Sequence, residues 1–365
     1  MKNLFKRVYD GKRILITGDT GFKGSWLAIW LKELGAKVYG YALPPQGKRD
    51  NFNVCSLYEI IHHEDGDVRD LNHLTQYFES VKPEITFHLA AQPLVIESYN
   101  NPHYTFETNL MGTVNFFEAV RKTDSIKAAV NITSDKCYKN NEWLWGYREC
   151  DPMGGNDPYS ASKGAAELIA HSYIQSFFSN NNRCSIASAR AGNVIGGGDW
   201  AEHRIVPDYF RAIEKRETLQ LRYPNATRPW QHVLEPLSGY LLLGAKLFAE
   251  GYKYSGGWNF GPLEQNNYSV KELVERIIGY TGQGNFTVPD NAEKKHESSL
   301  LKLDISKAIK LLDWRPVLNF EETVHMTADG YLAESNVKNI YIERVKQIYK
   351  YVETAAERNL NWINN

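Results

Sequence analysis

A tyrosine and a lysine four residues apart are the residues of this 365-residue chain best suited to proton transfer. They form the string Tyr159-Ser-Ala-Ser-Lys163. On a helix, this spacing places both side chains on one face, about one turn apart. An ammonium beside a phenol lowers the pKa of the phenol, so the phenolate accepts a proton from a hydroxyl as a hydride leaves. The pair therefore predicts a centre for oxidation of a hydroxyl group.

A second polar group, Ser134-Asp135-Lys136, directly follows a predicted strand at 127–133. We expect the Ser134 hydroxyl to bond the same substrate oxygen as Tyr159. Asp135 and Lys136 add a titratable pair at the carboxyl edge of the sheet, where open α/β folds bind their ligands.

A glycine-rich string, Thr17-Gly-Asp-Thr-Gly-Phe-Lys-Gly24, lies between a predicted strand and a predicted helix. Gly18 allows a tight turn, Gly21 lets the backbone approach a pyrophosphate, and Gly24 lets helix and strand pack closely. The helix start presents free N–H groups and a positive dipole end to phosphate. The string predicts a dinucleotide site.

An acidic residue about 20 positions onward commonly holds the adenosine ribose of NAD. Here the second predicted strand, 37–42, ends without Asp or Glu, and Lys48 and Arg49 follow. This departure weakens the preference for NAD over NADP and predicts a loosely held cofactor. Asp67 is the expected acceptor for the adenine amino group, with loop capping as the alternative.

Composition excludes several classes of protein. A formal net charge of −1 gives no basic excess for nucleic acid. Four cysteines without a CxxC pair, and the absence of HExxH, predict neither a disulfide framework nor a metal site. The chain has no signal-peptide pattern and no run of 18 apolar residues, so we expect a cytoplasmic protein with no membrane contact.

Short apolar runs alternate with amphipathic segments through the first half of the chain. Strands are predicted at 13–17, 37–42, 84–90, 127–133 and 184–190, and helices at 24–34 and 109–121. This alternation predicts an α/β protein with a Rossmann-type, doubly wound parallel sheet. We expect a cofactor domain over 1–192 and a smaller mixed α/β substrate domain over 193–365, with segments near 232–262 returning to the first domain. The charged helical pattern at 339–358 predicts a solvated or oligomer-packing helix.

Together the motifs resemble the extended short-chain dehydrogenase/reductase superfamily, which contains NAD-dependent epimerases and dehydratases. The resemblance rests on TGxxGFxG, His88-Leu-Ala-Ala-Gln92, Thr108-Asn109, Ser134-Asp-Lys and YxxxK, and it covers nearly the whole chain. The longer strings at 131–140, 189–200 and 228–236 are similar to one branch, the CDP-D-glucose 4,6-dehydratases.

The resemblance implies NAD as cofactor, CDP-D-glucose as substrate and a homodimer or homotetramer. It implies these cofactor contacts: Gly18, Thr20, Gly21, Phe22, Lys23, Gly24, Asp67, Val68, Leu89, Ala90, Ala91, Thr108, Tyr159 and Lys163. For the substrate it implies Gln92, Asn193, Arg204, Arg228 and His232. Arginine suits a diphosphate because its planar fork binds phosphate oxygens bidentately. An intrachain salt bridge is the alternative for Arg204 and for Arg228.

The chemistry implied is an internal redox cycle in deoxysugar synthesis of the O-antigen type. Tyr159 would take the 4-hydroxyl proton, and Asp135 would protonate the departing C6 oxygen. Lys136 would be the C5 base, if its pKa is lowered, or a cation that stabilises the enolate. A nucleotide-sugar 4-epimerase needs only the Tyr/Lys pair, and a non-catalytic nucleotide sensor needs neither; both remain alternatives.

Overall fold

The computed structural model describes residues 1–179, 183–263, 268–289 and 301–363. Its centre is a seven-stranded, all-parallel sheet with the order β11-β6-β5-β4-β1-β2-β3. The strands are β1 (Arg13–Thr17), β2 (Lys37–Ala42), β3 (His62–Asp65), β4 (Ile85–His88), β5 (Ala128–Ile132), β6 (Ser185–Arg190) and β11 (Gly256–Asn259). The expected Rossmann-type sheet is confirmed, and five strands lie where the apolar runs predicted them.

Strand order reverses between β1 and β4, which are hydrogen-bonded neighbours although β2 and β3 separate them in sequence. Ligands of open α/β sheets bind at such a switch point, outside the carboxyl ends of the strands. The glycine-rich string follows the carboxyl end of β1, and Ser134 follows the carboxyl end of β5, so both lie at this edge of the parallel sheet.

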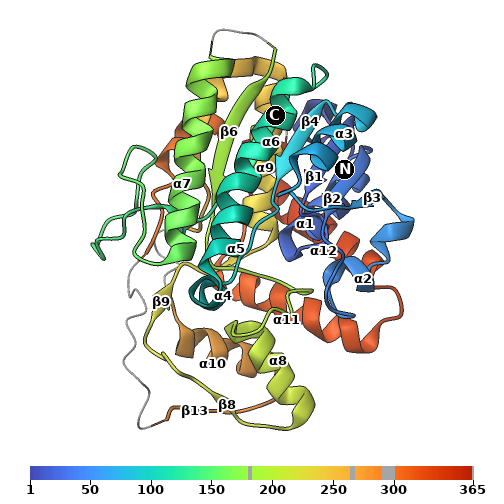
Figure 1. The fold of residues 1–365 in the computed structure, drawn as a ribbon. Helices are drawn as coiled ribbons and strands as arrows, with labels where there is room; N and C mark the ends of the chain where they lie inside the picture. The colour runs from blue at the N-terminus through green and yellow to red at the C-terminus, as the bar shows by residue number, and fades with distance from the viewer. Residues whose placement is uncertain (180–182, 264–267, 290–300, 364–365) are drawn as a thin grey trace.

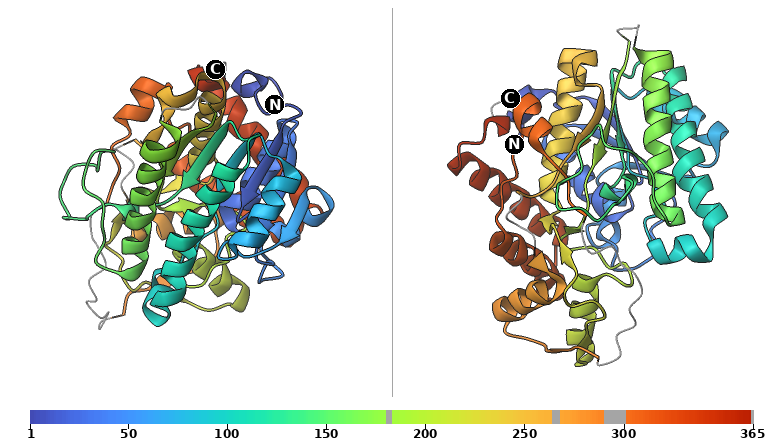
Figure 2. Two further views of the ribbon diagram at one scale, coloured as in Figure 1. Left: turned by 45° about the horizontal axis from the view of Figure 1, so that its top comes forward. Right: turned by 90° about the vertical axis from the view of Figure 1, so that its left-hand side faces the viewer.

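Helices cover both faces of the sheet, as Figure 2 shows in its right-hand view. The helices are α1 (Phe22–Glu33), α2 (Asn51–Val54), α3 (Leu71–Val81), α4 (Val95–Asn100), α5 (Pro102–Phe106), α6 (Gly112–Lys122), α7 (Pro158–Tyr173), α8 (Ile205–Lys215), α9 (Leu234–Glu250), α10 (Val270–Thr281), α11 (Phe320–Asn336) and α12 (Ile340–Glu357). Alternation along β1 decides which side chain meets which face: Ile14 and Ile16 join the core with α1, α9 and α12, and Leu15 joins the core with α3, α6 and α7.

A smaller lobe hangs below the carboxyl edge of the sheet (Figure 1). It contains α8, α10, α11 and short two-stranded ladders, around a separate core that includes Phe210, Leu273 and Tyr331. The ladders are β7 (Val194–Ile195) with β10 (Gln231–His232), β9 (Thr227–Arg228) with β12 (Tyr268–Ser269), and β8 (Leu219–Gln220) with β13 (Phe286–Thr287). The division of the chain at residue 192 stays a prediction.

The last helix differs from its expected role. The predicted helix at 339–358 exists as α12, but its inner face is buried through Arg344, Ile348 and Tyr351. It packs against α1 and α11 within the chain, so it is not simply a solvated helix. No helix among the described residues is long and apolar enough to cross a membrane.

Candidate active site

The glycine string forms a tight turn between β1 and α1, and a larger residue is excluded at its glycines for different structural reasons. A Cβ on Gly18, where φ is +80°, would lie 2.5 Å from the Ala90 nitrogen. A Cβ on Gly24 would lie 2.0 Å from the Gly18 carbonyl oxygen. Gly21, the N-cap of α1, is exposed, and no side chain caps the helix there. The loop therefore offers an open helix start of the kind that binds phosphate.

Other predicted cofactor residues gather at the same edge. Leu89 donates its N–H to the Thr17 carbonyl (2.9 Å), which brings the segment after β4 beside the glycine turn. Thr20 donates to the Leu43 carbonyl (2.9 Å), and the buried Oγ1 of Thr108 has no hydrogen-bond partner among the described residues. An open cradle and an orphaned hydroxyl fit a dinucleotide.

The two sequence features that bear on the adenosine end are already engaged in ion pairs. Asp67 pairs with Arg69 (2.6 Å), which holds the pKa of Asp67 low despite partial burial. Arg49 pairs with Glu214 (2.7 Å), and its guanidinium carbon lies 3.3 Å from the centre of the Trp200 ring. Its charge is therefore already paired within the protein. Adenine binding by Asp67 stays a prediction, as does binding by Val68, which is buried.

A carboxylate does lie against the second strand, but it comes from the glycine string. Asp19 is fully buried and pairs with His63 Nδ1 (2.6 Å), and a Cβ on Gly40 of β2 would lie 1.9 Å from its Oδ2. β3 is the edge strand, yet the His63 side chain is only 2% exposed because it turns inward to Asp19.

Ser134 and Asp135 form one bonded unit at the end of β5. Ser134 caps the 3-10 turn η4 (Asp135–Cys137), and its hydroxyl donates to Asp135 Oδ1 (2.9 Å). Asn193 Nδ2 donates to Asp135 Oδ2 (3.2 Å). Lys136 is partly buried and donates its backbone N–H to Ser134 Oγ (3.3 Å).

Tyr159 and Lys163 lie one turn apart on α7, as the spacing predicts, with Lys163 Nζ 5.9 Å from the centre of the Tyr159 ring. Burial lowers the pKa of Lys163 to about 8. The expected lowering of the tyrosine pKa is wrong. Burial raises the pKa of Tyr159 to about 12, and the hydrogen bond between Tyr159 and Ser134 only partly opposes this.

A second lysine, Lys23, is partly buried and lies near Lys163. Burial lowers the pKa of Lys23 to about 8; the nearby Arg204 adds to this effect, and Asp135 opposes it. The charge of Lys23 also lowers the pKa of Lys163. The site therefore gathers positive charge, which suits an anionic ligand.

A buried ion pair that sequence reasoning missed supports the catalytic elements. Glu167, one turn after Lys163 on α7, pairs with Arg190 of β6 (2.8 Å). The same Glu167 accepts a short hydrogen bond from Thr133, the residue before Ser134. Arg190 also donates to the hydroxyl of Tyr138 (2.5 Å). The one local signal that could have placed Glu167 beside the catalytic residues is its four-residue spacing from Lys163. No local pattern in the sequence indicates Arg190.

Two predicted substrate residues border the smaller lobe. Arg204 precedes α8 and pairs with Asp199 (2.7 Å), so the predicted alternative of a salt bridge is present; its side chain is nevertheless 35% exposed. The pKa of Arg204 is raised, mainly by the charge of Asp199 and in smaller part by Tyr159. Arg228 donates to the Thr227 carbonyl (2.9 Å) within β9.

Gln92 and His232 are both buried. The Gln92 amide bonds Leu94 and Thr105, which shapes the loop after β4. His232 lies edge-on to Trp26, and burial lowers its pKa to about 3. Substrate contact by these two residues stays a prediction.

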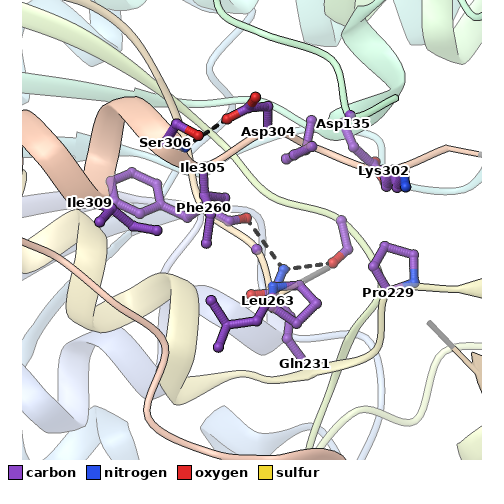
Figure 3. A pocket seen from close by; sticks show the side chains of 15 residues that line it. Asp135, Pro229, Gln231, Phe260, Leu263, Lys302, Asp304, Ile305, Ser306 and Ile309 are labelled. Carbon is purple, nitrogen blue, oxygen red and sulfur yellow. Dashed lines mark hydrogen bonds between the residues drawn. The ribbon is translucent and has the colours of Figure 1, made fainter. Parts of the chain in front are cut away.

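A cavity of about 230 Å³ opens beside Asp135 (Figure 3). Gln231 lies on its wall and donates to the carbonyls of Gly192 (2.8 Å) and Phe260 (3.4 Å). Ligand pockets usually measure about 300–1,000 Å³, so this cavity has room for only part of a nucleotide sugar. Its other walls include Pro229 and the segments 260–263 and 302–306.

A family model described as GDP-mannose 4,6 dehydratase matches residues 15–327. The chain belongs to the GDP-mannose 4,6-dehydratase family. Within the family it is 46% identical over 355 residues to a CDP-glucose 4,6-dehydratase of Salmonella typhimurium, covering 96% of this chain and 99% of that protein. It is 31% identical over 295 residues to a GDP-mannose 4,6-dehydratase of Vibrio cholerae, covering 75% of each chain.

Solved structures show the same fold at lower identity. A UDP-glucose 4-epimerase from Brucella ovis in complex with NAD aligns with a TM-score of 0.75 at 21% identity, over 87% of this chain and 97% of that one. A UDP-glucose 4-epimerase from Thermus thermophilus, also a complex with NAD, aligns with a TM-score of 0.72 at 24% identity, over 89% and 99% of the two chains. These likenesses establish the fold of this dehydratase-family member.

Proposed function

We propose that the protein converts CDP-D-glucose to CDP-4-dehydro-6-deoxy-D-glucose and water, with NAD as its recycled cofactor. Similarity to the Salmonella CDP-glucose 4,6-dehydratase over 96% of the chain carries this proposal. The site supports it, because a Tyr/Lys pair for oxidation and a carboxylic acid for elimination lie at one edge of the sheet.

The residues present fit NAD. The open helix start at Gly21 would hold the pyrophosphate, and Thr108 and Lys163 would face the rest of the cofactor. When bound, NAD accepts a hydride from C4 of the hexose and later supplies it to C6.

Tyr159 takes the proton of the 4-hydroxyl, and the Ser134 hydroxyl orients that oxygen. The Lys163 ammonium beside the ring favours the phenolate at the moment of transfer. The product of this step is a 4-ketone, which makes the C5 proton acidic.

Asp135 then protonates the C6 oxygen, so that it departs as water. Bonds from Ser134 and Asn193 hold the two carboxyl oxygens of Asp135, which fixes its direction. We assign the removal of the C5 proton to Lys136, which would act as a neutral amine. The alternative is that its ammonium stabilises the enolate. An Lys136→Ala variant that still exchanges the C5 proton with solvent at the wild-type rate contradicts the first role.

Turnover of CDP-, dTDP-, GDP- and UDP-glucose, each with added NAD⁺, tests the function. Mass spectrometry follows the loss of one water. We expect dehydration of CDP-glucose alone. Inversion at C4 without water loss would indicate a 4-epimerase, and no reaction with any substrate would indicate a nucleotide sensor; either result contradicts the proposal.

A further inference from the structure

Arg344 on α12 is a completely buried arginine in a part of the chain that follows the family match, which ends at residue 327. Its Nε donates to Asn51 Oδ1 (2.9 Å), its Nη1 to the Gly330 carbonyl (2.8 Å), and its Nη2 to Glu334 (2.5 Å). The guanidinium also lies 5.3 Å from the Trp26 ring. Burying a charge is costly unless its donors are paired, and here the hydrogen bonds reach two other helices, α2 and α11.

The loop 196–200, which leads from β7 towards Arg204, packs directly on this arginine. A Cβ on Gly197 would lie 2.5 Å from Arg344 Nη1 and 2.7 Å from the Gly330 carbonyl carbon. A Cβ on Gly198, where φ is +84°, would lie 2.5 Å from Asn51. The two glycines therefore leave just enough space for the loop to lie against the partners of Arg344.

Direct hydrogen bonds continue from these partners into the loop. The second oxygen of Glu334 accepts from Trp200 Nε1 (2.7 Å). Tyr331, one turn before Glu334 on α11, donates its hydroxyl to the Asp199 carbonyl (2.5 Å). The Asp199 carboxylate holds Arg204 (2.7 Å). Hydrogen bonds and the chain of the loop thus connect Arg344 on α12, through α11, to Arg204.

We propose that Arg344 is a positioning residue for the substrate: through Glu334, Trp200 and Asp199, it sets the place of Arg204 at the diphosphate of the nucleotide sugar. The inference rests on the proposed function, because it needs Arg204 to contact the diphosphate. Under it, the C-terminal helix pair α11–α12 is part of the substrate site and not only part of the core.

The test compares Arg344→Met and Trp200→Phe with Lys346→Met, a control on α12 whose ammonium pairs with Glu343 at the surface (2.7 Å). KM for CDP-glucose, kcat and the Kd of NAD⁺ are measured. Loss of a ground-state phosphate contact raises KM and leaves kcat nearly constant. We expect KM to rise about tenfold for Arg344→Met and about threefold for Trp200→Phe, with the Kd of NAD⁺ unchanged within about twofold. Lys346→Met should match the wild type.

A double-mutant cycle separates positioning from a general structural role. In an Arg204→Met background, Arg344→Met should raise KM no further, because the residue through which it acts is gone. If Arg344→Met does not fold, the KM of Trp200→Phe tests the inference, since this variant removes one hydrogen bond and keeps an aromatic ring.

An unchanged KM in Trp200→Phe, or additive effects in the cycle, overturns the inference while the proposed function stands. A wild-type protein that does not dehydrate CDP-glucose overturns the proposed function, and this inference with it.

Discussion

Asn193 and Asp135 are joined by a 3.2 Å hydrogen bond, although 58 residues separate them in sequence. Asn193 has a left-handed backbone (φ 53°), which turns its amide back toward the end of β5. A Cβ on the preceding Gly192 would lie 1.9 Å from Asp135 Oδ2, so the chain passes as close as a glycine allows. The acid proposed for elimination is thus held by the loop that leads into β7 of the smaller lobe.

Replacing Asp135 by Asn removes the acid and keeps its shape. We expect C4 oxidation to continue and loss of water to slow by about 100-fold or more, as for loss of a general acid. Absorbance of reduced cofactor, followed together with mass spectrometry of the sugar, separates the two steps. Equal loss of oxidation and dehydration would contradict a role confined to elimination.

The pH dependence of kcat/KM follows from the pKa values of two side chains on α7, Tyr159 and Lys163. The active form needs a Tyr159 phenolate (pKa about 12) and a Lys163 ammonium (pKa about 8). Below pH 8, only the phenolate fraction changes, so kcat/KM should rise about tenfold per pH unit. Above pH 8, each gain in phenolate is offset by loss of ammonium, so the profile should become level.

Two variants check this assignment. In Lys163→Met the break near pH 8 should vanish, and Tyr159→Phe should abolish turnover with the Kd of NAD⁺ nearly unchanged. A break that persists in Lys163→Met would show that another group titrates there.

Gly21 and Gly24 provide a matched pair of substitutions in the cofactor loop. Gly24→Ala forces a Cβ to within 2.0 Å of the Gly18 carbonyl oxygen, whereas in Gly21→Ala the nearest atom is 3.3 Å away. We expect Gly24→Ala to lower the free energy of unfolding by about 2–3 kcal/mol. Gly21→Ala should fold normally and bind NAD⁺ more weakly, because its methyl group enters the open helix start. Urea unfolding measures the free energy of unfolding, and calorimetric titration measures the Kd of NAD⁺. Equal loss of stability in both variants would contradict this distinction.

The buried Glu167–Arg190 pair predicts strong coupling. Arg190→Met leaves the Glu167 carboxylate buried without its partner, which costs about 3–5 kcal/mol of stability. In the double variant Glu167→Gln with Arg190→Met, no charge remains, so the loss should be clearly less than the sum of the single losses. Additive losses in urea unfolding would indicate that the pair is not energetically linked.

Acid sensitivity follows from His88, which is buried beside Thr17 (2.7 Å) and whose pKa is lowered by burial to about 3. Below pH 6.5, the unfolded chain binds a proton at this position and the folded protein does not until about pH 3. Stability contributed here is therefore full above pH 6.5 and is lost as the pH falls from 6.5 towards 3. His88→Asn should flatten the dependence of unfolding free energy on pH in that window. An unchanged slope would show that other groups cause the acid sensitivity.

The sequence by itself determined the elements whose chemistry is local. The apolar run at 13–17, the glycine spacing from Gly18 to Gly24 and the four-residue step from Tyr159 to Lys163 each act within one strand, turn or helix. Backbone geometry over a few residues is enough to predict them, and the structure has the strand, the turn and the shared helix face. The same reasoning placed Ser134 at the carboxyl edge, because it follows a buried strand.

Only the tertiary structure decided which distant groups meet. Asp19 with His63, Glu167 with Arg190, and Arg344 with Asn51 and Glu334 join segments that no local period relates. The pKa of Tyr159 moves upward for the same reason: burial depends on how distant parts of the chain pack around the ring, and its effect outweighs that of the hydrogen bond with Ser134. Packing sets both burial and pairing, and packing depends on the whole chain at once.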